Sequence, residues 1–177
     1  MSLEPYLRVD DTPFSARRAD IEGAHGPPQR IEPNAVGLTA LDYGHVVFRF
    51  QDSTGRLEEV TRHAPVLYLL SDDGVADVPF AALADYLRAR DARAFARGGF
   101  LVSPRYGLAF VPAEPDWVTA LAAHCVDTWR QLGQGAAGAE PQARTNSVTS
   151  GSSPSWRLRW PCTAGSNVAP GGSVSLE

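Results

Sequence analysis

The sequence contains no lysine, so its sixteen cationic side chains are all arginines. Without lysine the chain cannot carry a P-loop, and no G-x-G-x-x-G motif follows a predicted strand, so the usual nucleotide-binding motifs are absent. The formal net charge is −4, and the arginines are scattered among acidic residues. Proteins that bind nucleic-acid backbones usually carry a net basic face, so we expect no nucleic-acid partner.

Long apolar runs are missing as well. No run approaches the roughly 18 to 20 apolar residues of a membrane-spanning helix, and the N-terminus lacks the basic and then apolar pattern of a signal peptide. We therefore expect a cytoplasmic protein with no membrane partner. Cysteine is scarce, with only Cys125 and Cys162. Structural disulfides belong to oxidising compartments, so both cysteines are predicted to be thiols.

The clearest structural pattern lies in residues 42–50, where apolar and polar side chains alternate. Val46, Phe48 and Phe50 fall on one face of an extended chain, which is the pattern of a half-buried strand. Residues 52–55, with the sequence Asp-Ser-Thr-Gly, then supply the residue types of a turn. These two stretches together predict the first arm of a hairpin and its turn.

Residues 57–62 should return antiparallel to that strand, because a short turn usually joins neighbouring antiparallel strands. Their alternation is imperfect, since Leu57 and Val60 have opposite parity. This mismatch predicts a β-bulge or an exposed edge. Residues 66–70 form a continuous apolar run, which predicts a strand buried on both faces.

The remaining patterns predict an α+β fold. Proline and glycine signals predict helices that start near Pro13, Pro79 and Pro115. Residues 1–12 are expected to form a loosely attached arm, from which Tyr6, Leu7 and Val9 could pack against the body. Further strands are expected at residues 36–41, 100–102 and 106–111. We predict one largely antiparallel sheet of about five to six strands, covered by two to three helices.

The chain changes character after Gly133. Residues 134–177 are rich in Gly, Ser, Pro and Ala and poor in apolar side chains, so they form a low-complexity C-terminal appendage to a single domain of residues 1–133. Residues 156–160, with the sequence Trp-Arg-Leu-Arg-Trp, alternate and could add an edge strand. The two alternatives for the appendage are a disordered tail and a tail loosely docked through residues 156–160.

Two groups of residues raise the question of chemistry. His124 and Cys125 are adjacent, but neighbours on a helix point about 100° apart, so within the expected last helix we interpret Cys125 as a core side chain. We expect His124 to bond Asp127 or Thr128 on the same helix. His45, His63, Glu58 and Glu59 show no metal-ligand spacing, and Glu58 and Glu59 should point to opposite sides of a strand. No catalytic, cofactor-binding or metal-ligating residue is therefore predicted.

Size, acidity and the missing motifs favour a non-enzymatic bacterial protein-binding domain, with an immunity or inhibitor protein that neutralises a basic partner as its concrete form. The alternative is a small enzyme or ligand-binding domain with a pocket between sheet and helices. In both cases the predicted surface includes His45, Arg49, Arg105 and Tyr106. The sequence leaves the oligomeric state open.

Overall fold

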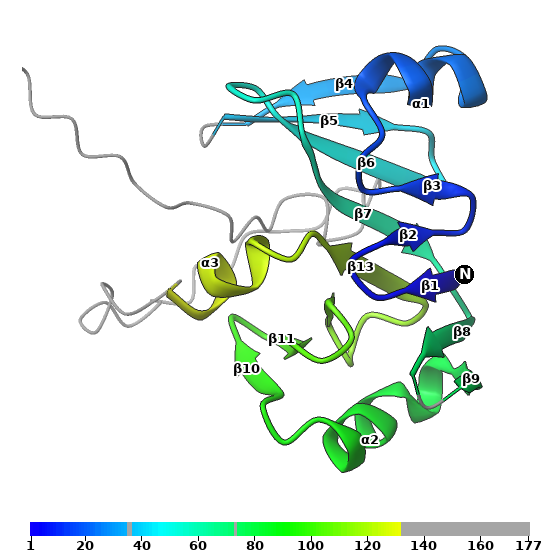
Figure 1. The fold of residues 1–177 in the computed structure, drawn as a ribbon, viewed down its shortest axis with the longest axis vertical. Coiled ribbons are helices and arrows are strands. Elements are labelled where there is room, and N and C mark those ends of the chain that lie inside the picture. The colour runs from blue at the N-terminus through cyan, green and yellow to red at the C-terminus, as the bar shows by residue number, and fades with distance from the viewer. Residues whose placement is uncertain (35–36, 73, 132–177) are drawn as a thin grey trace, which may run out of the picture.

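The computed structural model describes residues 1–34, 37–72 and 74–131. Within these ranges the chain forms two sheets, of five and eight strands, and three helices (Figure 1). The α+β class and the largely antiparallel pairing are confirmed. The prediction of one sheet of about five to six strands is wrong, because short N-terminal strands build a second sheet that the sequence pattern did not indicate.

The five-stranded sheet has the order β3-β2-β1-β8-β9 and consists of β3 (Thr12–Pro13), β2 (Arg8–Val9), β1 (Ser2–Glu4), β8 (Val66–Ser71) and β9 (Gly74–Pro79). The eight-stranded sheet has the order β10-β11-β12-β13-β7-β6-β5-β4. Its strands are β10 (Phe95–Arg97), β11 (Phe100–Ser103), β12 (Leu108–Phe110), β13 (Trp117–Leu121), β7 (Leu57–His63), β6 (Val46–Gln51), β5 (Leu38–Asp42) and β4 (Arg30–Pro33).

Residues 1–12 belong to the body of the protein, which corrects the expectation of a loose arm. β1 pairs with β8 in register Leu3↔Leu69, the one parallel pair among the strands that the structure describes. Leu3 is 0% exposed and packs in the main core. In Figure 1 the blue β1 accordingly lies close to the green β8.

Val46, Phe48 and Phe50 on β6 all enter the main core, as predicted. The prediction of a half-buried strand is wrong, because Val47 and Arg49 on the opposite face are buried as well. The predicted bulge is present at the pairing of β6 with β7. Arg49 pairs with Glu59 and Phe50 with Leu57, so Glu58 is the extra residue. β7 lies between β6 and β13, so the bulge, and not an exposed edge, explains the broken alternation.

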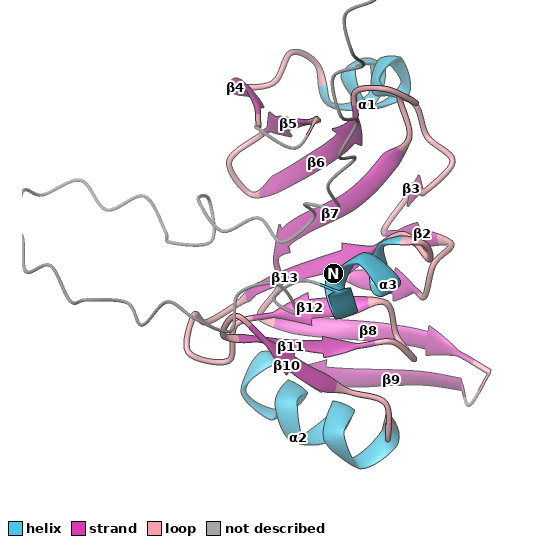
Figure 2. Ribbon diagram, turned by 90° about the vertical axis from the view of Figure 1, so that its left-hand side faces the viewer, coloured by secondary structure: helices cyan, strands magenta, loops and turns pink. Residues whose placement is uncertain are grey.

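β8 is buried on one face only, although its apolar run predicted burial on both. Leu67 and Leu69 point into the core, while Tyr68 on the other face is 45% exposed. β8 pairs with β9 along its whole length, and Figure 2 shows this hairpin with α2 (Phe80–Arg90) below it. The outward side of the hairpin is therefore a surface with apolar residues on it.

The three helices are shorter than their patterns indicated. α1 (Arg18–His25) begins after Pro13, which lies in β3. The predicted helix from Pro115 is wrong in its first half, where the chain forms β13 between β12 and β7, and only α3 (Cys125–Gln131) is helical. Residues 118–121 of β13 are all buried, and β13 pairs with a strand on each side, so this long-range pairing overrides the four-residue repeat.

Most buried side chains form one core. A second cluster lies under α3, where the Trp129 ring packs edge-on against Phe100 at 5.1 Å between centroids. None of the helices in the described ranges is long and apolar enough to span a membrane. The predicted appendage, with the strand at residues 156–160 and the thiol Cys162, lies outside the described residues.

Candidate functional site

The four residues predicted to form a surface do not gather in one place. His45 is exposed in the turn before β6, whereas Arg49 is buried on β6 with its guanidinium 3.7 Å from the carboxylate of Glu59. Arg105 and Tyr106 lie next to each other and line one hollow, which His45 and Arg49 do not touch.

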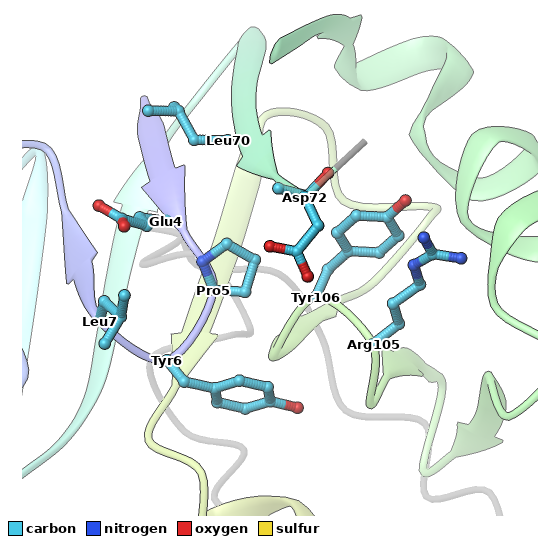
Figure 3. A pocket seen from close by; sticks show the side chains of 9 residues that line it. Glu4, Pro5, Tyr6, Leu7, Leu70, Asp72, Arg105 and Tyr106 are labelled. Atoms are coloured by element: carbon cyan, nitrogen blue, oxygen red, sulfur yellow. The ribbon is translucent and has the colours of Figure 1, made fainter. Parts of the chain in front are cut away.

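This hollow, the Arg105 hollow, has a volume of about 430 Å³. Its lining comes from three separate segments of the chain, the loop after β1, the end of β8 and the turn before β12, as Figure 3 shows. The residues are Glu4, Pro5, Tyr6, Leu7, Leu70, Ser71, Asp72, Arg105 and Tyr106. Charges of both signs therefore stand around an apolar and aromatic floor, an arrangement that suits a polar ligand or a side chain of a partner.

Tyr6 is held in the lining by an unusual backbone. Its φ is 66°, in the left-handed region that a bulky residue seldom adopts. Its hydroxyl donates to the carbonyl of Pro104, and burial raises the pKa of the phenol. The ring lies so close to Gly107 that a Cβ there would stand 2.7 Å from Tyr6 Cε1. A residue in such a strained conformation persists only where neighbouring contacts hold it in place. Residues of this kind cluster at binding and active sites.

Asp91 fixes the turn that carries Arg105. The carboxylate of Asp91 accepts hydrogen bonds from the Ser103 hydroxyl at 2.7 Å and from the backbone N–H of Arg105 at 2.8 Å. Burial favours the neutral carboxyl, but these bonds and a third from the N–H of Arg93 outweigh it and lower the pKa of Asp91. The charged form of Asp91 therefore positions this side of the hollow.

The outward side of the β8–β9 hairpin continues from the hollow at Leu70. We call it the hairpin face; its residues are Val66, Tyr68, Leu70, Val75, Asp77 and Pro79, which share one side because Leu70 pairs with Val75 and Tyr68 with Asp77. Val75 is 70% exposed. Tyr68 and Val75 are diagonal neighbours on adjacent strands, so they form a continuous apolar surface.

A second arrangement lies on the other side of Tyr6, where Glu58, His124 and Cys125 meet. The Cys125 thiol donates to Oε2 of Glu58 at 3.0 Å, and the His124 imidazole bonds the same oxygen. Glu58 is the bulge residue of β7, and its carbonyl accepts from the N–H of Ala122 just after β13. The bulge therefore directs the carboxylate to the start of α3.

His124 contacts both Glu58 and Arg56. Its Nε2 bonds the Glu58 carboxylate, and one guanidinium nitrogen of Arg56 lies 2.9 Å from Nδ1 and 3.1 Å from Nε2. Cys125 and Glu58 are buried, whereas the His124 side chain is 45% exposed and lines a hollow of about 380 Å³ that Tyr6, Phe14 and Arg17 also line.

The sequence prediction for this cluster was right in part. Cys125 is buried as expected. The expected geometry is wrong, because His124 lies in the turn before α3 and contacts Glu58 and Arg56, not Asp127. The signal that could have found the cluster was the parity mismatch around Glu58, which marks the bulge.

Comparisons of the chain with protein-family models, with curated proteins and with solved structures give no match.

Proposed function

We propose that the chain is a non-enzymatic protein-binding domain whose partner docks on the hairpin face. The observation that carries this proposal is the exposure of Tyr68 and Val75, which are diagonal neighbours on that face and are joined by Leu70, the partner of Val75 in the pairing. Single exposed apolar residues are ordinary, but a continuous apolar surface on a small domain usually serves an interaction. Leu7, which is 60% exposed and lines the Arg105 hollow together with Leu70, extends this surface.

The position of β9 supports the same proposal. β9 is the terminal strand of its sheet and has six residues, which makes it the longest of the four terminal strands in the described ranges. β3, β10 and β4 are shorter, and β4 carries the ion pair of Arg30 with Glu32, a feature that discourages pairing. Both β4 and β9 end in a proline, so length and charge distinguish them. A partner strand could add to β9 while its side chains pack on the hairpin face.

The charges around the face favour a basic partner. Asp72 and Asp77 are exposed at the turn and on the face itself, and the whole chain has a net charge of −4. Complementary charge speeds encounter and selects the partner. A bacterial immunity or inhibitor protein that neutralises a basic toxin is the concrete form of the proposal.

The experiment compares capture of binding proteins by three forms of the chain: wild type, Tyr68→Glu with Val75→Glu, and Ile31→Glu. Ile31 is 48% exposed on the edge strand β4, so it is a matched apolar-to-acid control away from the hairpin face. We expect one protein to be captured by wild type and by the control and to be lost with the double variant. Equal capture by all three folded forms would overturn the proposal.

A second candidate, a small-ligand-binding domain, is favoured by the strained Tyr6 beside Arg105 and Asp72 in the Arg105 hollow. The ligand would be a small carboxylate or phosphate compound, held by the exposed guanidinium. The test is a thermal-shift screen of such compounds on wild type and Arg105→Ala. A stabilisation that only wild type shows supports this candidate, and no stabilisation of wild type excludes it.

A further inference from the structure

We propose that Glu58, His124 and Cys125 form a binding site for Zn²⁺. One ligand atom of each residue, the thiol Sγ, an imidazole nitrogen and a carboxylate oxygen, lies within 4.8 Å of the other two. Zinc binds such atoms at about 2.0 to 2.3 Å, which places its ligands roughly 3.2 to 3.6 Å apart in a tetrahedron. Side-chain adjustments of less than about an ångström therefore bring the three atoms onto one ion. This site is separate from the hairpin face and does not depend on the proposed partner.

The types of donor select the metal. A thiolate and a neutral imidazole are ligands for zinc and other late transition metals, whereas Mg²⁺ and Ca²⁺ prefer oxygen ligands alone. The His124 imidazole already bonds the Glu58 carboxylate, and its nitrogen becomes available to a metal once that hydrogen bond is exchanged. Three protein ligands leave the fourth position of a zinc tetrahedron to water, and the exposed side of His124 gives solvent access to it.

Burial and backbone structure place two of the donors with little freedom. Glu58 and Cys125 are both buried, and the bulge at Glu58 directs the carboxylate toward the thiol. A buried carboxylate beside a thiol is costly unless the charge is compensated, and a divalent cation compensates it fully. Pre-placed ligands also lower the ordering cost of binding.

Arg56 occupies the position of a competing cation. Its guanidinium donates to His124 at 2.9 Å and lies 3.9 Å from the Glu58 carboxylate, and its side chain is half exposed. We infer that zinc displaces Arg56 toward solvent. In the binding step the S–H bond of Cys125 breaks, a sulfur–zinc bond forms and the thiol proton passes to solvent, so affinity falls as the pH is lowered.

The experiment titrates Co²⁺ into protein that lacks a histidine tag and carries Cys162→Ser, so that Cys125 is the one thiol. Co²⁺ substitutes for zinc and reports a thiolate ligand by its charge-transfer absorption. We expect saturable binding with this absorption, its loss on addition of Zn²⁺, and a stability increase with Zn²⁺ alone. Glu58→Gln, His124→Ala and Cys125→Ser should each weaken Zn²⁺ binding more than about tenfold.

Two further variants separate a zinc site from a purely structural hydrogen-bond network. Arg56→Ala removes the competing charge and should tighten Zn²⁺ binding about tenfold, whereas a structural network would only lose a contact. His63→Ala is the matched control, because His63 also pairs with an acid, Asp116 at 3.7 Å, on the exposed surface. Because His124 is exposed, its variant tests the site even if Glu58→Gln fails to fold. The proposal is overturned if the charge-transfer band is absent or if Co²⁺ binds His124→Ala as tightly as the parent.

Discussion

The carboxylate of Glu58 lies 3.0 Å from the thiol of Cys125, although 67 residues separate them in the chain. Two features of the backbone produce this contact. β13 pairs with β7 in register Leu121↔Glu59, which brings the start of α3 to the bulge, and the bulge adds Glu58 to β7 as an unpaired residue. A regular strand would place alternate residues on opposite faces.

Deleting Glu58 should therefore leave the sheet intact. Without this residue, Leu57 directly precedes Glu59 in the chain. The pairs Phe50↔Leu57 and Arg49↔Glu59 then follow each other in a regular antiparallel ladder. Circular dichroism and a cooperative thermal transition should persist. Deleting Thr61 from the same strand is the control, because it turns the preceding side chains to the wrong face and should unfold the chain. Equal loss of stability in the two deletion variants would contradict the conclusion that Glu58 is an extra residue that the sheet does not need.

Gly107→Ala should destabilise the fold by about 1 to 3 kcal/mol, measured by denaturant unfolding. Gly107 has a φ of 58°, and an added Cβ would press on the Tyr6 ring. Gly23→Ala is the matched control, since Gly23 lies in α1 with nothing within 4 Å of a Cβ, and it should stabilise by roughly 0.5 to 1 kcal/mol. Adding Tyr6→Ala should recover part of the loss in Gly107→Ala. An unchanged stability in Gly107→Ala would contradict the close packing of Tyr6.

Leu3→Ala should cost about 2 to 5 kcal/mol of unfolding free energy, because Leu3 lies on β1 and its side chain is fully buried in the main core. Leu7→Ala, a few residues away and exposed, should change stability by less than about 0.5 kcal/mol. If both variants lose less than about 0.5 kcal/mol, residues 1–12 do not pack in the core and form a loose arm.

Stability should depend on acid pH through Asp91. Its pKa is lowered in the folded state, so its ionised form contributes stability that is fully present above the unfolded pKa and is lost as the pH falls through the folded pKa. Asp91→Asn has no titrating group there. The difference in melting temperature between wild type and Asp91→Asn should be largest near neutral pH and should shrink below about pH 4. If the difference in melting temperature stays constant as the pH is lowered below about 4, the charge of Asp91 does not contribute to stability.

Local patterns predicted the elements that local forces determine. The core face of Val46, Phe48 and Phe50 and the turn at residues 52–55 were confirmed, since side-chain period and turn chemistry are properties of neighbouring residues. Burial of the opposite face of β6 was missed, because segments distant in sequence cover it. The strand at Trp117–Leu121 was missed because its pairing partners lie far away in sequence, and long-range pairing overrode the helical spacing.

The candidate sites show the same limit. His124, Cys125 and Glu58 were each considered from the sequence, but their meeting depends on the register of β13 on β7, which no local pattern records. The Arg105 hollow depends on the two-residue strands β2 and β3, which return the chain beside β1 and carry no periodic signal. The exposed face of β8 was missed, because an apolar run alone does not indicate whether a second layer of structure covers both faces of the strand.

Site-specific photocrosslinking tests the central claim, docking of a partner protein on the hairpin face, most directly. A photoreactive residue is placed at Val75 in one form and at Ile31 in another, and both are irradiated in native lysate. We predict that one protein crosslinks from position 75 and not from position 31, and that addition of Tyr68→Glu abolishes it. Crosslinking from position 31 alone, or from neither position, would contradict the assignment of the hairpin face as the docking surface.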